Sequence, residues 1–418
     1  MSKLYITGGK VLQGDIKVHG AKNSALPLLA ATILCGGECI LHNCPRLSDV
    51  TASLKILTHL GCSCKREGST VTVDSSVISK NEIPDDLMRE MRSSIVFLGA
   101  VAGRTGGAHI SSPGGCELGP RPIDLHISAL RKMGLKIQED HGYLNCSAPE
   151  GLKGKDIMLQ FPSVGATENI MLAAVLADGT TTIHGAAREP EISDLADFLN
   201  KAGADIRGAG SDTVVVTGVK KLHAVEHTVI PDRIAAATYM AAAAVTRGSV
   251  CVKDTCPSHM KATLDIFREC GCDMDICGTE ITLSCHHRPQ KVNGVKTLVY
   301  PGFPTDAGPP VLSVLAVADG TSLFVENIFQ SRFKYIDELQ RLGAKIKTHS
   351  NVALIEGCER LSGAKTESTD LRGGAALVVA ALFADGITEV GSIHHIDRGY
   401  ESIEDNLVSL GAEIKRKD

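Results

Sequence analysis

"IDELQRLGAKI", residues 336–346, is the segment that shows how this chain is built. Its apolar residues recur at helical spacing up to Leu342, and Gly343 then stands where a helix would end in a left-handed cap. The same pattern occurs six times along the chain. The other copies are "SLKILTHLGCSC" (53–64), "ISALRKMGLKI" (127–137), "LADFLNKAGADI" (195–206), "TLDIFRECGCDM" (263–274) and "IEDNLVSLGAEI" (403–414).

The glycines of these segments give the period of the repeat. They are Gly61, Gly134, Gly203, Gly271, Gly343 and Gly411, at successive separations of 73, 69, 68, 72 and 68 residues. Six units of about 70 residues therefore fill the chain. Each unit also has a second helical segment that is apolar nearly all round and is followed by a glycine turn and a strand, within residues 26–44, 95–112, 170–186, 236–254, 310–327 and 376–393. A helix without a polar face is buried on every side.

This repeat predicts an α/β fold, and two architectures are compatible with it. A solenoid is the simplest arrangement, but about 70 residues is long for a solenoid unit. In the alternative, three units pack their buried helices together inside a ring of sheets, so that the chain forms two globular lobes. Aromatic residues make up 4% of the chain and tryptophan is absent, which suits a core of Ala, Leu, Val and Ile.

Composition argues against several classes of function. A net charge of −5 disfavours nucleic acid as the main partner, because phosphate binding needs a basic surplus. The longest apolar stretches, such as 237–245, are too short to span a bilayer, and no signal-peptide core begins the chain. With fourteen cysteines, this predicts a cytoplasmic protein with free thiols. The pairs Cys62/Cys64 and Cys270/Cys272 lack zinc-ligand spacing and are expected to be small buried hydrophobes.

Candidate functional side chains stand just before helices, where the repeats differ from one another. A lysine or arginine at such an entrance, beside free backbone N–H groups, can bind an anion. Each position also has an ordinary explanation as a helix cap or a solvated surface residue. The candidates are Lys22 and Asn23, Arg92, Cys116 with Arg121, Asp306, Asp370 with Arg372, and Arg398. If three buried helices run parallel in each lobe, their N-termini converge and favour a polyanionic ligand between the lobes.

Seven motifs of the sequence resemble those of a known family. They are "GAKNSALP" (20–27), "MRSSI" (91–95), "PGGCELGPRPIDLHISAL" (113–130), "FPTD" (303–306), "SRFKYIDELQRLGA" (331–344), "TDLRGGAALVVAAL" (369–382) and "HIDRGYESIEDNL" (395–407). The chain resembles the UDP-N-acetylglucosamine 1-carboxyvinyltransferases, within the superfamily of EPSP synthase-like enolpyruvyl transferases. The resemblance runs over nearly the whole chain.

The resemblance implies a two-lobed inside-out α/β barrel with three repeats in each lobe. One lobe is expected at residues 22–229 and the other at 1–21 plus 230–418, with the active site in the cleft between them. The implied reaction transfers the enolpyruvyl group of phosphoenolpyruvate to the 3′-hydroxyl of UDP-N-acetylglucosamine and releases phosphate. It proceeds through a tetrahedral ketal and begins peptidoglycan synthesis. No metal or other cofactor is expected.

The resemblance also implies roles for particular residues. Cys116 is the general acid, forms a covalent adduct with phosphoenolpyruvate, and is the site that fosfomycin alkylates. Asp306 is the base for the sugar hydroxyl, and Asp370 takes part in proton exchange at the methylene carbon. Lys22, Arg121 and Arg398 hold phosphoenolpyruvate, and Arg332 and Arg372 lie either behind the residues that contact the substrates or on the phosphate side. The residues expected to face the nucleotide sugar are Asn23, Arg92, Arg121, Pro122, Ile123, Asp124, Leu125, Ser163, Val164, Gly165, Asp306 and Ile328.

Two features and two rival functions remain open. The segment after Asp306 reads "AGPP", where many relatives carry a glutamine-containing stretch, and Glu117 stands next to Cys116 in a loop that is expected to close over the cleft. Glu117 either raises the pKa of the thiol or points into solvent. An enolpyruvyl transferase with a different acceptor and a catalytically silent nucleotide-sugar-binding regulator are the alternatives.

Overall fold

A computed structural model describes residues 2–111 and 123–417 of the chain. These residues form two compact units. The N-terminal unit comprises residues 20–111 and 123–230, and the C-terminal unit comprises residues 2–19 and 231–417. The chain passes from one unit to the other between residues 19 and 20, and again between 230 and 231.

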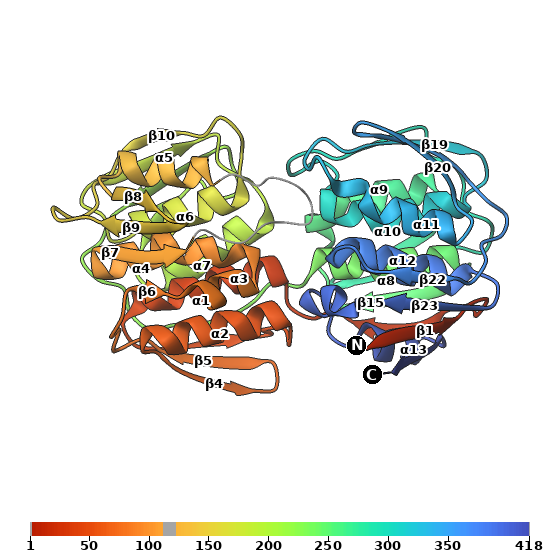
Figure 1. The fold of residues 1–418 in the computed structure, drawn as a ribbon, viewed down its shortest axis with the longest axis horizontal. Helices are drawn as coiled ribbons and strands as arrows, with labels where there is room; N and C mark the ends of the chain where they lie inside the picture. Colours follow the sequence, from red (N-terminus) through yellow and green to blue (C-terminus); the bar gives the residue numbers. More distant parts are fainter. Residues whose placement is uncertain (1, 112–122, 418) are drawn as a thin grey trace. The chain divides into compact units, whose positions relative to one another are not determined.

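The N-terminal unit is built around apolar helices enclosed by sheets (Figure 1). Its inner helices are α1 (Lys22–Cys35), α4 (Phe97–Thr105) and α6 (Val164–Ala174), and its other helices are α2 (Ser48–Leu60), α3 (Asp85–Glu90), α5 (Asp124–Lys132) and α7 (Pro190–Lys201), with a 3-10 turn η1 (Arg92–Val96) before α4. Helix α1 packs against both α4 and α6, and α4 packs against α6. Every residue of α1 except Asn23 is buried, as expected for a helix without a polar face.

The strands of this unit form four-stranded sheets around the inner helices. In spatial order they are β14 (Glu226–Thr228), β3 (Glu38–His42), β5 (Thr70–Asp74) and β4 (Ser63–Glu67); β6 (Glu82–Ile83), β7 (Gly107–Ser111), β9 (Tyr143–Ser147) and β8 (Lys136–Asp140); and β10 (Asp156–Met158), β11 (Thr180–His184), β13 (Thr213–Thr217) and β12 (Asp205–Arg207). In each sheet the first pair is parallel and the other two are antiparallel. Alternate residues such as Val71 and Val73 in β5 point into the core.

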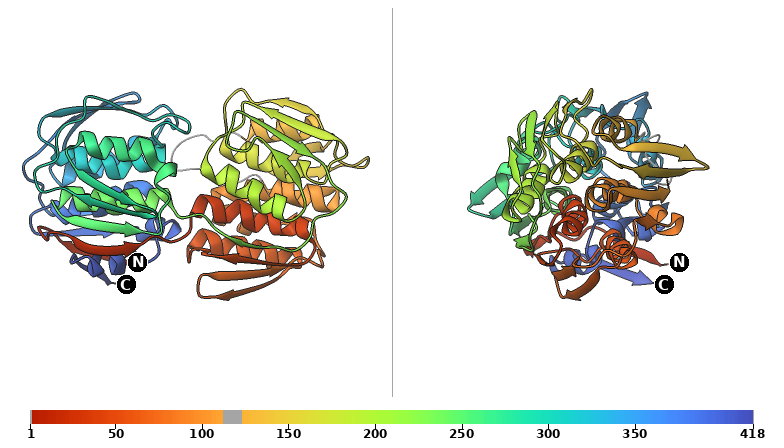
Figure 2. Two further views of the ribbon diagram at one scale, coloured as in Figure 1. Left: turned by 180° about the vertical axis from the view of Figure 1, so that it is seen from behind. Right: turned by 90° about the vertical axis from the view of Figure 1, so that its left-hand side faces the viewer.

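The C-terminal unit repeats this plan (Figure 2). Its inner helices are α8 (Arg233–Val245), α10 (Gly308–Val317) and α12 (Leu371–Phe383), its outer helices are α9 (Lys261–Glu269), α11 (Ile336–Arg341) and α13 (Ile403–Ser409), and its 3-10 turns are η2 (Pro257–Met260), η3 (Thr305–Ala307), η4 (Arg332–Tyr335) and η5 (Ile393–Arg398). Helices α8, α10 and α12 pack against one another in all three pairings. Residues 234–245 of α8 and 372–382 of α12 are all buried.

The sheets of the C-terminal unit use strands from both ends of the chain. In spatial order they are β16 (Asp273–Cys277), β17 (Glu280–Ser284), β15 (Ser249–Lys253) and β2 (Gln13–Lys17); β18 (Val295–Lys296), β19 (Thr321–Val325), β21 (Val352–Glu356) and β20 (Lys345–His349); and β22 (Lys365–Glu367), β23 (Ile387–Gly391), β1 (Lys3–Thr7) and β24 (Glu413–Lys417). Strand β1 lies between β23 and β24, so an N-terminal strand completes the sheet of the last repeat.

The predicted repeat and fold class are confirmed. The described residues contain six four-stranded sheets, one for each repeat. The glycines that follow the six amphipathic segments all have positive φ, between 79° and 109°, which is the left-handed conformation expected at these helix ends. Since the buried helices pack together inside each unit, the solenoid alternative is wrong.

Candidate active site

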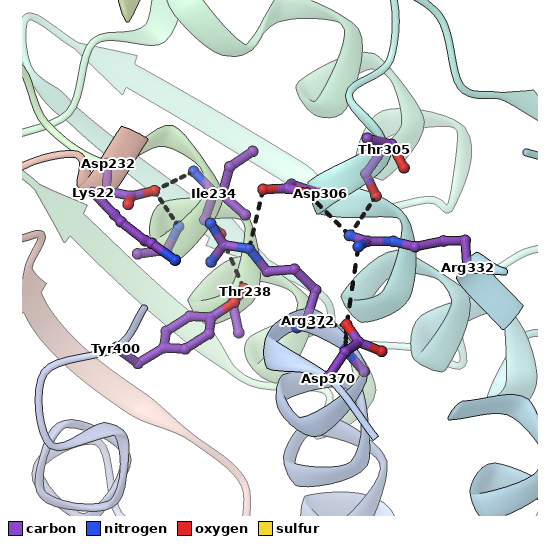
Figure 3. A network of polar contacts seen from close by, with 12 residues as sticks. Lys22, Asp232, Ile234, Thr238, Thr305, Asp306, Arg332, Asp370, Arg372 and Tyr400 are labelled. Atoms are coloured by element: carbon purple, nitrogen blue, oxygen red, sulfur yellow. Dashed lines mark hydrogen bonds and ion pairs between the residues drawn. The ribbon is translucent and has the colours of Figure 1, made fainter. Parts of the chain in front are cut away.

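The entrances to the inner helices of the C-terminal unit carry carboxylates (Figure 3). Asp232 caps α8 by accepting hydrogen bonds from the backbone N–H groups of Ile234 and Ala235 at 2.8 and 2.9 Å. Asp370 caps α12 in the same way, at 3.1 and 3.0 Å from two backbone nitrogens. Because these carboxylates occupy the first N–H groups of both helices, the positive charge of this site comes from side chains.

Asp306, in η3 before α10, is held by two arginines. Its Oδ1 lies 3.1 Å from Nη2 of Arg332, and its Oδ2 lies 3.3 Å from Nε of Arg372. Both arginine side chains are only 2% exposed, whereas that of Asp306 is 26% exposed. The carboxylate is therefore fixed from the protein side by charge-assisted hydrogen bonds and remains accessible from the solvent side.

The two arginines are themselves anchored. Arg332 also donates to the backbone oxygen of Thr305 at 3.1 Å, and its Nη1 lies 3.9 Å from Asp370. The guanidinium of Arg372 lies over the ring of Tyr400, 5.3 Å from the centroid. Burial works against the charge of Arg372, but its charged and polar neighbours outweigh that effect and raise its pKa above the ordinary value.

Two donors of these arginines have no acceptor among the residues that the structure describes. They are Nε of Arg332 and Nη1 of Arg372, and both are buried. Buried N–H groups are almost always hydrogen-bonded in folded proteins. These groups can therefore hold a water molecule or part of an anionic ligand.

The N-terminal unit has a buried ion pair at the start of α1. Nζ of Lys22 lies 2.7 Å from Oδ2 of Asp49, which belongs to the first turn of α2. The two side chains are 9% and 2% exposed. Lys22 is therefore a fixed cation in the first position of a helix and not a solvated surface lysine.

The other predicted residues of this unit lie at the beginnings of helices. Asn23 is exposed on α1, and Arg92 is half-buried as the first residue of η1. Ser163 caps α6 by accepting a hydrogen bond from the N–H of Ala166 at 3.3 Å. The remaining residues lie before or in the first turns of α5 and α6; Ile123, Leu125, Val164 and Gly165 are half-buried and Asp124 is exposed.

His126 is a member of this region that sequence reasoning missed. Its Nδ1 lies 2.9 Å from Nδ2 of Asn169, which also donates to the backbone oxygen of Ile95 at 2.8 Å. The imidazole therefore accepts through Nδ1 and carries its proton on Nε2. A Cβ on Gly165 would lie 3.2 Å from the ring, so α5 and α6 meet here. Burial, and secondly the charge of Arg92, lowers the pKa of His126 to about 4.

Replacing His126 with glutamine should change how stability depends on pH. In the unfolded chain this histidine takes up a proton below its ordinary pKa of 6.5, but in the folded chain it does so only near pH 4. The neutral ring therefore contributes stability above pH 6.5, and the contribution is lost as the pH falls toward 4. We expect the free energy of unfolding of the wild type to fall by about 3 kcal/mol more than that of His126→Gln between pH 7 and pH 4.

Chemical denaturation at a series of pH values measures this difference. His141→Gln is the control, because the His141 side chain is 92% exposed and the same substitution there removes a histidine without removing a buried ring. Equal pH dependence in the wild type and His126→Gln would show that the ring is not held in its neutral form.

Three of the predicted site residues lie outside the described residues: Cys116, Arg121 and Pro122. Glu117 and the expected lid loop lie outside them too.

Ile328 is half-buried, and its backbone N–H donates to Oε1 of Glu326 at 2.8 Å. Arg398 is the last residue of η5 and precedes α13, which is an outer helix. The pattern of the other basic candidates predicts a position at the entrance of a buried helix, and Arg398 does not have that position.

The "AGPP" segment after Asp306 spans the end of η3 and the beginning of α10. Gly308 is the first residue of this helix, and a Cβ there would lie 2.9 Å from Cζ of Phe324. Pro309 and Pro310 occupy the first turn, where backbone N–H groups have no partner within the helix. Both the glycine and the prolines therefore follow from packing and helix geometry.

The cysteine pairs behave as core residues rather than as metal ligands. Cys62, Cys270 and Cys272 are buried, and Cys64 is half-buried. Burial raises the pKa of Cys62 and of Cys270 to about 12. Within residues 2–111 and 123–417, no three His, Cys, Asp or Glu side chains come together as a set of metal ligands. The helices of the same ranges are all too short or too polar to cross a membrane.

Comparison with known proteins places this arrangement among enolpyruvyl transferases. Residues 6–407 match the family model described as EPSP synthase (3-phosphoshikimate 1-carboxyvinyltransferase). A UDP-N-acetylglucosamine 1-carboxyvinyltransferase 2 from Caldanaerobacter subterraneus subsp. tengcongensis is 52% identical, with 100% of both chains covered. A UDP-N-acetylglucosamine 1-carboxyvinyltransferase 1 from Symbiobacterium thermophilum is 49% identical over 99% of this chain and 95% of the relative.

Solved structures show the same fold. The enolpyruvyl transferase NikO from Streptomyces tendae superimposes with a TM-score of 0.90 at 26% identity, covering 100% of this chain and 99% of that one. An EPSP synthase from Acinetobacter baumannii superimposes with a TM-score of 0.77 at 18% identity, covering 100% of both chains. The second likeness concerns the fold alone.

Proposed function

This chain belongs to the UDP-N-acetylglucosamine 1-carboxyvinyltransferases of the EPSP synthase family, and we infer from that membership that it transfers the enolpyruvyl group of phosphoenolpyruvate to UDP-N-acetylglucosamine. The enzyme is a transferase, and its reaction is the first step of peptidoglycan synthesis. We place the acceptor at the 3′-hydroxyl of the sugar. We place the reaction in the cytoplasm, since the thirteen cysteines among the described residues are all free thiols.

The clamped carboxylate of Asp306 is the observation that carries the proposal. A general base must present an oxygen to the hydroxyl that it deprotonates, in a fixed geometry. Arg332 and Arg372 fix both oxygens of Asp306, while part of the carboxylate stays accessible. The nearby unfilled N–H groups of the two arginines suit an anionic substrate that carries phosphate.

The remaining chemistry is assigned to basic, thiol and carboxylate side chains. Lys22, Arg121 and Arg398 would neutralise the phosphate and carboxylate of phosphoenolpyruvate. Addition forms a bond from the sugar oxygen to C2 of phosphoenolpyruvate as C3 gains a proton, which gives a tetrahedral ketal. Elimination then removes phosphate from C2 and a proton from C3. We assign Cys116 to the protonation of C3 and Asp370 to proton exchange at the same carbon.

Product analysis with two acceptors tests this proposal. Incubation with phosphoenolpyruvate and UDP-N-acetylglucosamine should convert the nucleotide sugar into its enolpyruvyl ether, as seen by mass spectrometry. Shikimate 3-phosphate in its place should remain unchanged. Conversion of shikimate 3-phosphate alone would assign a different acceptor, and conversion of neither, with binding of the nucleotide sugar intact, would indicate a silent binding protein.

Replacing Cys116 with aspartate should separate catalysis from inhibition. Aspartate keeps a proton-carrying group at this position, so we expect turnover within about tenfold of the wild type, because the general acid is replaced and not removed. The variant lacks the thiolate nucleophile that opens the epoxide of fosfomycin, so no covalent adduct should form. Intact-mass measurement after incubation with fosfomycin checks this. An adduct of the variant with the same mass shift as the wild type would contradict the assignment of Cys116.

A further inference from the structure

Glu326 is a buried carboxylate directly after β19 that the proposed chemistry does not use. It is 2% exposed, and the nearby Arg332 forms its ion pairs with Asp306 and Asp370 instead. Oε1 of Glu326 accepts hydrogen bonds from the backbone N–H groups of Ile328 and Phe329 at 2.8 and 3.1 Å. A buried carboxylate is costly unless donors of this kind surround it.

The same carboxylate reaches two further segments. Oε1 accepts from the hydroxyl of Thr297 at 2.9 Å, and Oε2 accepts from the hydroxyl of Thr305 at 2.9 Å. Thr297 in turn accepts from the N–H of Asn327 at 2.8 Å, which fixes the loop from its other side. One side chain therefore ties the loop after β19 to the turn that carries Asp306.

The hydrogen bonds of Glu326 join the loop that contains Ile328 to the turn that contains Asp306. In the proposed reaction these two segments must be aligned for the removal of the proton from the acceptor hydroxyl. Ile328 is the residue of this loop that is expected to face the acceptor sugar, and Thr305 is the neighbour of the proposed base. Arg332 also connects the loop after β19 with the turn that carries Asp306. It donates to the backbone oxygen of Thr305 at 3.1 Å, and its guanidinium lies over the ring of Phe329, 5.8 Å from the centroid. The loop and the turn are therefore both held by the charged groups of Glu326 and Arg332.

We propose that Glu326 is a positioning residue that aligns the acceptor-binding loop at Ile328 with the base Asp306. The inference rests on the proposed function, since it concerns the acceptor of that reaction. Catalysis between two groups depends steeply on their relative placement, and a displacement of about 1 Å can cost about 10²-fold in rate. A simple loop anchor would stabilise the fold but would leave the chemistry of correctly folded molecules unchanged.

Three variants distinguish the bond from Glu326 to Thr305 from its bonds to the loop that contains Ile328. Thr305→Val removes only the bond on the side of Asp306, so kcat should fall about tenfold while the affinity for UDP-N-acetylglucosamine is unchanged. Glu326→Ala removes both kinds of bond, so the Kd of the nucleotide sugar should rise and kcat/KM for it should fall about 10²-fold. Glu326→Gln keeps a carbonyl oxygen for the loop N–H groups and should recover most of the affinity.

Glu338→Ala is the matched control. This glutamate also lies in the C-terminal unit, its side chain is 14% exposed, and it accepts a hydrogen bond from the backbone N–H of Glu367 at 3.0 Å. Its hydrogen bonds are with Arg341 and the backbone of Glu367, so its loss should lower the melting temperature and leave kcat and KM unchanged. Steady-state kinetics, calorimetric binding of UDP-N-acetylglucosamine and thermal unfolding are measured for all four variants.

The pattern of the results decides the proposal. It is supported if Thr305→Val changes kcat alone, Glu326→Ala changes both affinity and turnover, and Glu326→Gln recovers most of the affinity that Glu326→Ala loses. It is overturned if Thr305→Val and Glu326→Gln melt earlier than the wild type but keep its kcat, KM and Kd. If Glu326→Ala does not fold, the other two variants still decide. Failure of the proposed function would look different, because the wild type itself would then produce no enolpyruvyl ether.

Discussion

Asp306→Asn should lower kcat by about 10²–10⁴-fold, which is the usual contribution of a positioned general base. Asparagine has nearly the same shape but no basic oxygen for the acceptor hydroxyl. Its carbonyl oxygen can still accept a hydrogen bond from Arg332 or Arg372, so the site should keep its form. The KM values of both substrates should therefore change much less than kcat.

A control for this variant is available at the other end of helix α10. Asp319→Asn removes the same charge just after α10, where the side chain is 67% exposed and pairs with Arg288 at 3.6 Å. Steady-state rates of phosphate release should be unchanged in this control. If Asp306→Asn turned over within about threefold of the wild type, another group would have to be the base.

Lys22→Met should have the second large effect, on activity and on stability together. Truncating one partner of a buried charge pair costs about 2–5 kcal/mol in binding, which corresponds to roughly 30- to 4,000-fold in kcat/KM for phosphoenolpyruvate. The same change deprives the carboxylate of Asp49 of an ammonium at 2.7 Å. We expect the free energy of unfolding to fall by about 3–5 kcal/mol.

The double variant Lys22→Met/Asp49→Asn separates the two effects. Asparagine removes the buried charge that has lost the Lys22 ammonium, so most of the stability should return. Activity should not return, because the cation for phosphoenolpyruvate is still missing. Denaturant unfolding and kcat/KM for phosphoenolpyruvate measure both quantities, and recovery of activity in the double variant would show that Lys22 acts only through the fold.

The fold was predictable because it depends on local signals that recur. Each amphipathic segment ends at a glycine with positive φ, and each inner helix lacks a polar face, so both are visible in a single repeat. The entrances of the inner helices were predictable in the same way for Lys22, Asp306 and Asp370. Asp232 was not predicted, although it caps α8 as Asp370 caps α12.

The connections between site residues were not predictable, because tertiary packing makes them. Asp306 meets Arg332 and Arg372, which follow it by 26 and 66 residues. His126 is fixed by Asn169, 43 residues away, and its low pKa arises from burial that no local pattern reports. Glu326 reads as an ordinary glutamate after a strand, and only the packed structure brings Thr305 to it.

Phosphate release from phosphoenolpyruvate, measured with each substrate omitted in turn, tests the central claim most directly. We predict steady release when phosphoenolpyruvate and UDP-N-acetylglucosamine are both present, and no sustained release with phosphoenolpyruvate alone. Sustained release without the nucleotide sugar, or no release with both substrates present, would contradict the assignment of this chain as an enolpyruvyl transferase acting on UDP-N-acetylglucosamine.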